Sequence, residues 1–162
     1  MFPELLKEAG YYTVLSGKNH MGQEVGRAFY TISKGRGPGL EDDWIELMQN
    51  RPADKPFFFW FGSSDAHRGW KEDERGDQYL PDEVVVPRML FDGPKTREDL
   101  TGYYHEITRT DHILGEIVEE LQNQGIYNNT YVIYMSDNGR PFPRCKTRVY
   151  DSGIKKIGRA HV

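Results

Sequence analysis

The chain has little cysteine, no long apolar run and no large excess of one charge. Its 162 residues contain a single cysteine, Cys145, which excludes an internal disulfide framework. No apolar stretch reaches the roughly 20 residues that span a bilayer, so no membrane segment is expected, and the first residues lack the apolar region of a signal peptide. A net charge of -4, spread along the chain, gives no reason to expect nucleic acid as the main partner.

The order of helix and strand patterns predicts an α/β fold with a largely parallel central sheet. Residues 3–9, 41–50 and 97–124 have helical patterns, and the Glu and Arg residues of the last are expected to be solvated. Residues 11–15, 57–61 and 131–135 are strand-like, and the continuous aromatic run 57–61 suggests burial on both faces. Residues 17–40 are interpreted as a long loop and residues 68–97 as a surface excursion.

Polar residues follow each of the three predicted strands. Lys18 and His20 come after the first, His67 after the second, and Asp137 and Asn138 after the third. In open α/β sheets ligands bind beyond the carboxyl ends of the strands, so these residues are the candidates for chemistry. The alternative for Ser-Asp-Asn-Gly at 136–139 is a plain turn, which those residues also favour.

The candidate residues suggest a metal and an anion. Asp137 and Asn138 offer oxygen ligands, which suit a hard cation such as calcium, although two ligands leave the site incomplete. Lys18 and His20, two positions apart, could hold one anion such as sulfate or phosphate, or could be incidental loop residues. His67 could be a general acid or a buried structural histidine.

A further cation, Lys146, lies a few residues beyond the predicted metal ligands. It follows Pro141-Phe142-Pro143-Arg144, and cations together with a histidine and metal ligands would make an anion-hydrolysis site. The neighbouring Cys145 has no base beside it in sequence and is interpreted as a bystander.

Taken together and in order, these motifs resemble the formylglycine-dependent sulfatases of the alkaline-phosphatase-like superfamily, and most of all the heparan N-sulfatase (sulfamidase) branch. Gly17-Lys18-Asn19-His20-Met21-Gly22 is similar to the family's Gly-Lys-x-His-x-Gly motif, and residues 57–70 to the segment of a second histidine, with Ala66 in place of the usual proline. Ser136-Asp137-Asn138-Gly139 is similar to the family's calcium-binding motif.

The resemblance implies a role for each candidate residue. Lys18 and His20 would contact the sulfate and the nucleophile, His67 would protonate the leaving group, and Lys146 would hold the sulfate. Asp137 and Asn138 would bind Ca2+. The expected fold is sulfatase-like, with a mostly parallel sheet flanked by helices.

The chain departs from the family pattern at both ends. The formylglycine precursor motif, Cys-x-Pro/Ser-x-Arg, does not occur, so we expect residues 1–156 to be a partial catalytic domain that begins beyond the nucleophile. Residues 157–162 also break from the pattern and can be encoded by a common sequencing adapter, so we expect them to be a non-native tail and do not count His161 as a ligand.

The expected function is therefore hydrolysis of a sulfate ester or sulfamate, on a sulfated carbohydrate, by a longer parent protein. By resemblance, that parent would be periplasmic, extracellular or lysosomal. Two alternatives stay open: a phosphodiesterase or phosphonate hydrolase of the same superfamily, and a non-catalytic homologue that binds anions or glycans.

Overall fold

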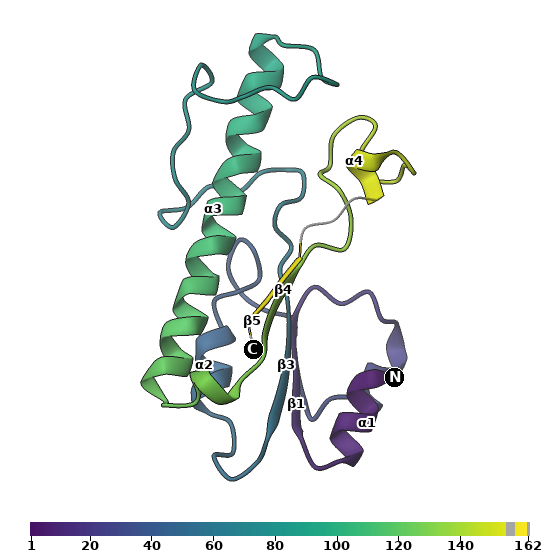
Figure 1. Cartoon of the computed structure of the whole chain (residues 1–162), viewed down its shortest axis with the longest axis vertical. Coiled ribbons are helices and arrows are strands. Elements are labelled where there is room, and N and C mark those ends of the chain that lie inside the picture. Colours follow the sequence, from purple (N-terminus) through teal and green to yellow (C-terminus); the bar gives the residue numbers. More distant parts are fainter. Residues whose placement is uncertain (155–157, 162) are drawn as a thin grey trace. The chain divides into compact units, whose positions relative to one another are not determined.

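The computed structural model describes residues 1–154 and 158–161 (Figure 1). The chain forms two compact units, Met1–Asp65 and Ala66–Val162. Among the described residues, no helix is both long enough and apolar enough to cross a membrane.

A parallel three-stranded sheet forms the centre of the first unit, which confirms the predicted α/β class (Figure 1). Its strands are β1 (Tyr12–Gly17), β2 (Thr31–Ser33) and β3 (Phe57–Gly62), in the order β2-β1-β3. The helices of this unit are α1 (Phe2–Glu8), the short 3-10 helix η1 (Gln23–Arg27) and α2 (Trp44–Gln49).

The central strand, β1, is the most deeply buried part of this unit. Thr13, Val14, Leu15 and Ser16 are all inaccessible to solvent. The apolar cluster around Leu15 contains Val25, Ala28 and Phe29, with Met21 and Phe58 packed against it. Asp43, at the start of α2, accepts hydrogen bonds from Ser16 of β1 at 2.8 Å and from Ser33 of β2, so one buried carboxylate ties two strands together.

Two expectations for this unit are wrong. The segment predicted as a long loop, 17–40, contains η1 and β2, because a strand of three residues is too short to show an alternating pattern. β3 is not buried on both faces: Trp60 is 42% exposed and the other residues of the strand are half-buried.

The second unit is built around one long helix, α3 (Pro94–Asn123), which confirms the strongest predicted helix. Residues 66–93 have no regular helix or strand, as expected of the surface excursion. After α3 come η2 (Tyr127–Asn129), β4 (Val132–Met135), α4 (Asp151–Ile154) and β5 (Gly158–His161).

The predicted strand near residues 131–135 exists as β4, but it is not part of the parallel sheet. It pairs in antiparallel fashion with β5, with Val132 opposite His161. Of the predicted tail, residues 158–161 form β5, whereas residues 157 and 162 lie outside the described part of the chain. The boundary at residue 157 and the non-native origin of the tail stay predictions.

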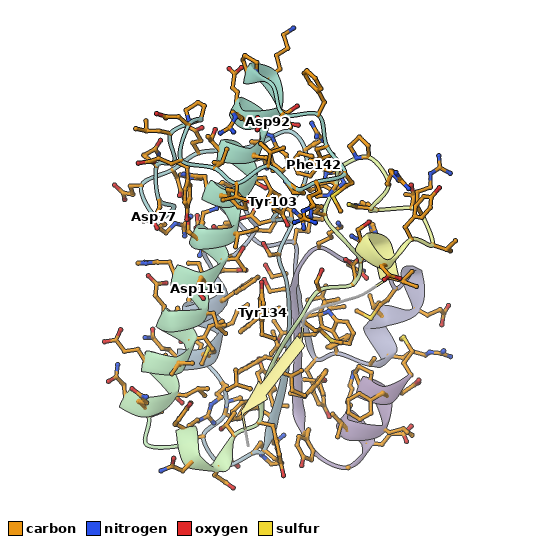
Figure 2. The ribbon with its side chains drawn as sticks, turned by 45° about the horizontal axis from the view of Figure 1, so that its top comes forward. Asp77, Asp92, Tyr103, Asp111, Tyr134 and Phe142 are labelled. Atoms are coloured by element: carbon orange, nitrogen blue, oxygen red, sulfur yellow. The ribbon has the colours of Figure 1, made fainter. Side chains whose placement is uncertain are left out.

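A second apolar cluster packs against the amino-terminal half of α3. Val84, Leu100, Phe142 and Cys145 are buried in it. The Phe142 ring lies edge-on to Tyr103 of α3 with ring centroids 5.4 Å apart, and both are visible in Figure 2. This cluster fixes the segment that follows the predicted metal ligands to the helix.

Candidate active site

Two glycines bring the carboxyl ends of β1 and β3 into contact. Gly17 has φ +91°, and a Cβ atom there would lie 2.1 Å from the carbonyl oxygen of Gly62. A Cβ atom at Gly62 would lie 2.6 Å from the carbonyl oxygen of Lys18. The backbone N–H of Lys18 donates to the Gly62 carbonyl at 2.6 Å. Only glycine fits at both places, and the result is that Lys18 leaves the sheet beside the end of β3.

Lys18 and His20 follow this contact in a short irregular segment. Lys18 is half-buried and His20 is exposed. Between them the Asn19 side chain accepts the backbone N–H of Met21 at 2.8 Å, a local bond that shapes the turn. Both predicted anion contacts therefore stand just beyond the carboxyl end of β1, within the first unit.

The residues after β3 are held by the loop around Gly39. The Ser63 hydroxyl and the Ser64 backbone N–H both donate to the Gly39 carbonyl, at 3.1 and 2.9 Å. A Cβ atom at Gly39 would lie 2.4 Å from Glu41 Oε2 and 2.6 Å from Asp65 Oδ2, so two carboxylates share this place. Glu41 is buried, and it was not expected at this place.

His67 belongs to the second unit and its ring has a defined tautomer. The Nδ1 atom lies 2.7 Å from the carbonyl oxygen of Arg68, and since a carbonyl can only accept, Nδ1 carries the hydrogen. The side chain is exposed, which argues against the alternative of a buried structural histidine.

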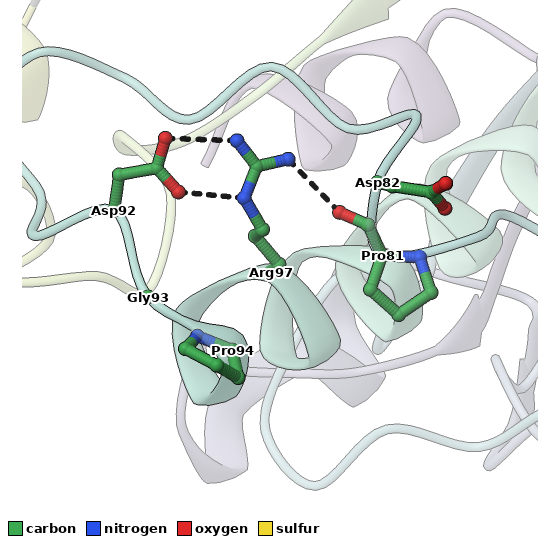
Figure 3. Close-up of a pocket in the computed structure, with 6 residues that line it drawn as sticks. All are labelled: Pro81, Asp82, Asp92, Gly93, Pro94 and Arg97. Atoms are coloured by element: carbon green, nitrogen blue, oxygen red, sulfur yellow. Dashed lines mark hydrogen bonds and ion pairs between the residues drawn. The ribbon is translucent and has the colours of Figure 1, made fainter.

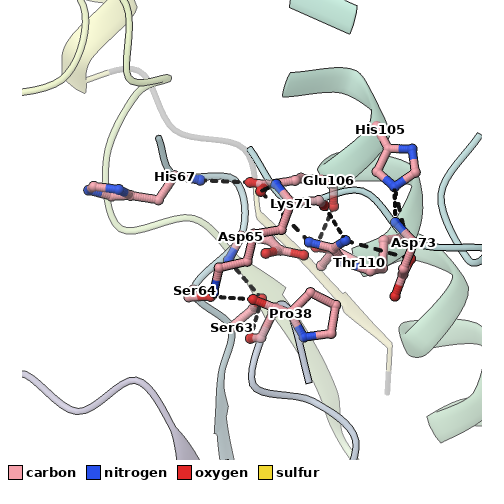
Figure 4. Close-up of polar contacts among 12 residues, drawn as sticks. Pro38, Ser63, Ser64, Asp65, His67, Lys71, Asp73, His105, Glu106 and Thr110 are labelled. Atoms are coloured by element: carbon pink, nitrogen blue, oxygen red, sulfur yellow. Dashed lines mark hydrogen bonds and ion pairs between the residues drawn. The ribbon is translucent and has the colours of Figure 1, made fainter. Parts of the chain in front are cut away.

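Glu106 of α3 fixes the backbone on both sides of this loop (Figure 4). One carboxylate oxygen accepts the N–H of His67 and the other accepts the N–H of Lys71, each at 2.9 Å. Glu106 is 1% exposed. Burial raises the pKa of Glu106, although the two backbone N–H groups and the nearby Arg109 act in the opposite direction.

Three further polar residues extend the Glu106 contact. Arg109 is fully buried and donates to the Lys71 carbonyl at 2.5 Å. His105 accepts the backbone N–H of Asp73 at Nε2 (3.0 Å), and its Nδ1 lies 3.1 Å from the Asp77 carbonyl, which identifies a neutral ring. Partial burial works to raise the pKa of Asp73, but hydrogen bonds from Arg75 outweigh it and the pKa is lowered.

The expectation that the Glu and Arg residues of this helix are solvated is wrong for Glu106 and Arg109, and His105 is buried on the same face. The sequence did carry a signal. These three positions continue the helical spacing of the buried Gly102 and Ile113, so they lie on the face that α3 turns to its own unit.

Arg68 connects the His67 loop with the segment that leads to Lys146. Its guanidinium makes a bidentate pair with Asp99, at 2.9 and 2.5 Å, and donates to the Pro141 carbonyl at 2.9 Å. It also lies over the Phe142 ring, 4.8 Å from the centroid. The structure thus joins the loop that carries His67 to the segment that carries Lys146 through one arginine.

Asp137 and Asn138 lie in the turn after β4. The Asn138 amide nitrogen donates to the Gly139 carbonyl at 2.8 Å, so its oxygen remains available as a ligand, and Asp137 is exposed. The Asp137 carboxylate and the Asn138 amide oxygen are ligands of the kind that calcium takes, but calcium needs about six to eight ligands. Within residues 1–154 and 158–161, no three His, Cys, Asp or Glu residues come together as a metal site. Calcium binding by Asp137 and Asn138 stays a prediction.

Lys146 is half-buried and stands in a tightly bonded loop. Its backbone N–H donates to the Arg140 carbonyl at 3.1 Å, and the neighbouring Cys145 is fully buried. The structure thus places His67, Asp137, Asn138 and Lys146 in the second unit, and Lys18 and His20 in the first. The joint site stays a prediction.

Comparison with known proteins decides the family. Residues 40–156 match the sulfatase family. The chain belongs to that family. Human N-sulphoglucosamine sulphohydrolase is 31% identical over 93% of this chain and 36% of its own length. An ulvan-active sulfatase of Formosa agariphila is 30% identical over 58% of the chain and 16% of its own length.

A third relative, an endo-4-O-sulfatase of Bacteroides thetaiotaomicron, is 29% identical over 62% of the chain and 21% of its own length. The chain thus spans about a third or less of the relatives it matches. The predicted family and its α/β, alkaline-phosphatase-like fold are confirmed.

Proposed function

We propose that the chain is part of a sulfatase that hydrolyses a sulfate ester or a sulfamate on a carbohydrate. The observation that carries this proposal is the match to the sulfatase family over residues 40–156. The relatives support the substrate class, since one is named for an N-sulphoglucosamine and another for ulvan. By the same resemblance, the parent protein works in a periplasmic, extracellular or lysosomal compartment.

In this proposal, some residues of the chain stabilise charge and one residue transfers a proton. Lys18 and Lys146 would hold the sulfuryl oxygens, where cations stabilise the charge of the transition state. His20 would position the attacking group. Asp137 and Asn138 would contribute to a Ca2+ site. Calcium and a formylglycine, when present, would supply charge neutralisation and the attacking oxygen.

His67 is the proton donor in this proposal. With Nδ1–H directed to the Arg68 carbonyl, the protonated ring presents Nε2–H to the departing oxygen or nitrogen. Glu106 and Arg68 hold the loop in place, so the ring needs little reorganisation before the proton is transferred. We expect the 162-residue chain alone to be inactive, because it lacks the Cys-x-Pro/Ser-x-Arg motif.

The test is an assay of the complete gene product with matched aryl sulfate, sulfamate and phosphate substrates. Sulfate or sulfamate turnover supports the proposal, whereas turnover of the phosphate alone indicates the phosphodiesterase alternative. Binding without turnover of any of them indicates the non-catalytic homologue.

The His67→Gln variant of that protein tests the role of the ring. The expected result is a loss of kcat by about 100-fold or more for a poor leaving group. The loss should be much smaller for nitrophenolate, which needs no proton. Equal losses for both leaving groups would contradict the role given to His67. His112→Gln, which changes an exposed histidine of α3, is the matched control.

A further inference from the structure

The segment after the predicted metal ligands contains four cations and no carboxylate. Arg140, Arg144, Lys146 and Arg148 fall within residues 139–150, and neither Asp nor Glu occurs in that range. Three of the four, Arg144, Lys146 and Arg148, line one hollow of about 430 Å³ together with Pro141, Phe142, Pro143 and Thr147. Only Lys146 has been given a role so far.

The backbone of this loop is fixed by packing and by hydrogen bonds. Phe142 and Cys145 are buried in the apolar cluster on α3. The Ser152 hydroxyl donates to the Arg144 carbonyl at 2.8 Å, and the Arg148 N–H donates to the Cys145 carbonyl at 3.1 Å. A Cβ atom at Gly153 would lie 2.1 Å from the Arg148 carbonyl oxygen. The buried anchors alternate with the cations, so the cations are held close together despite their repulsion.

Several arginines elsewhere in the chain are neutralised by carboxylates. Arg68, Arg75 and Arg97 each pair with a carboxylate. By contrast, over residues 1–154 and 158–161 no ion pair is made by Arg144, Lys146 or Arg148. Arg144 lies over the Tyr150 ring instead, 4.9 Å from its centroid, a contact that keeps its full positive charge.

A second hollow in the same unit serves as a comparison. It is lined by Pro81, Asp82, Asp92, Gly93, Pro94 and Arg97. Figure 3 shows that Asp92 neutralises Arg97 through two bonds, at 2.6 and 2.8 Å, while the Pro81 carbonyl accepts a third N–H. The Val84 carbonyl accepts a fourth N–H, so most donors of that guanidinium are used and its charge is neutralised by Asp92. By contrast, the guanidinium groups of Arg144 and Arg148, which line the other hollow, are not neutralised by a carboxylate among the described residues.

We propose that Arg144 and Arg148 form a second anion subsite beside Lys146, so that the enzyme prefers a carbohydrate with a sulfate or carboxylate in addition to the sulfate it removes. This inference rests on the proposed function, in which Lys146 holds the reacting sulfuryl group. A guanidinium suits either anion because its paired N–H groups match two oxygens at once. The subsite selects the substrate and takes no part in the chemical step.

The experiment compares two substrates in the complete protein: an aryl monosulfate with a single anionic group, and a disaccharide with two sulfates. For Arg144→Gln plus Arg148→Gln, the expected result is a KM for the disaccharide raised by about tenfold or more, with kcat nearly unchanged. The kinetics of the aryl monosulfate should stay within about twofold. Arg88→Gln, which removes an exposed cation that does not line the hollow, is the control.

Two results would overturn the subsite: an unchanged KM for the disaccharide, or an equal loss with both substrates. If the wild-type protein hydrolyses neither substrate, the proposed function fails separately. Calorimetric binding of the disulfated disaccharide then tests the subsite by itself, since the double variant must bind it at least about tenfold more weakly than wild type.

Discussion

At the scale of single residues, Glu106 has the clearest consequence for the candidate site. Its two carboxylate oxygens accept two backbone N–H groups that stand four residues apart, at His67 and Lys71. A carboxylate can do this because both of its oxygens are acceptors. An amide has one oxygen and directs its NH2 group at the other N–H, so Glu106→Gln keeps the shape and breaks one of the two bonds.

The Glu106→Gln variant of the complete protein should therefore lose kcat by roughly tenfold to a hundredfold with little change in KM, because His67 is displaced from its working position. It should also lose about 1–3 kcal/mol of stability. Amide hydrogen exchange at His67 and Lys71 should accelerate. Glu119→Gln, an exposed glutamate of the same helix, is the control. Unchanged exchange at both amides would show that Glu106 does not hold the loop.

The raised pKa of Glu106 gives a prediction for pH. Because burial raises the pKa above its ordinary value of 4.5, the folded protein keeps this proton to a higher pH than the unfolded chain. The stabilisation from that proton is complete below about pH 4.5 and is lost as pH rises through the raised pKa. Urea unfolding from pH 4 to 7 measures the free energy of unfolding of both proteins. The free energy of wild type minus that of Glu106→Gln should fall as pH rises. If this difference grows with pH instead, the raised pKa of Glu106 is contradicted.

The residues that could be predicted and those that could not differ in their setting. Short motifs at or beyond the strand ends mark the candidate site residues, which are Lys18, His20, His67, Asp137, Asn138 and Lys146. Glu106 and Arg109 were missed, because charged residues are solvated on most helices and their helical spacing with Gly102 and Ile113 is a weak signal against that expectation. Their burial depends on the chain segment 66–77, whose course has no regular pattern in the sequence.

At the scale of secondary structure, the paired glycines at the ends of β1 and β3 should be the least replaceable positions of the parallel sheet. A side chain at Gly17 would meet the Gly62 carbonyl and would also have to adopt φ +91°. Gly17→Ala should therefore cost about 1–3 kcal/mol and move Lys18 away from the strand end. Gly26→Ala in η1 is the matched control, because no atom lies within 4 Å of its added Cβ.

Chemical denaturation measures the stability of both glycine variants, and sulfate inhibition of the complete protein reports on Lys18. The expected pattern is a stability loss and weaker sulfate inhibition for Gly17→Ala only. If Gly26→Ala is equally destabilising, the close approach of β1 and β3 is not what requires glycine at position 17.

The elements themselves differ in how well sequence predicts them. The thirty-residue helix α3 has a long periodic pattern and an initial proline, and it was predicted within three residues at its start. β2 has three residues and was missed. The pairing of β4 with β5 could not be predicted either, because partner choice depends on which strand edge is within reach, and the strand pattern is the same for both partners.

At the scale of the whole molecule, the family could be predicted because several weak motifs occur together and in order. A Gly-Lys-Asn-His segment or a Ser-Asp-Asn-Gly turn alone is compatible with ordinary loops. Their order along 162 residues matched one family, and the comparison over residues 40–156 confirmed it. The substrate and the cleaved bond of the proposed sulfatase depend on loop side chains, which such motifs do not describe.

The exposed apolar surface of β4 gives the last prediction. Ile133 and Met135 are 67% and 69% exposed on this strand, next to Tyr131 at 71%. Apolar side chains on a short two-stranded sheet favour association with other apolar surfaces. The 162-residue chain, expressed alone, should therefore form soluble oligomers or aggregates and bind a hydrophobic dye.

The variant Ile133→Lys plus Met135→Lys should shift the chain towards monomer in size-exclusion chromatography with light scattering, and should bind less dye. Asn128→Lys plus Asn129→Lys adds the same charge at exposed polar positions and is the control. If both pairs improve solubility equally, net charge is responsible. If the unmodified chain is already a monomer and binds no dye, the apolar side chains of β4 do not drive association.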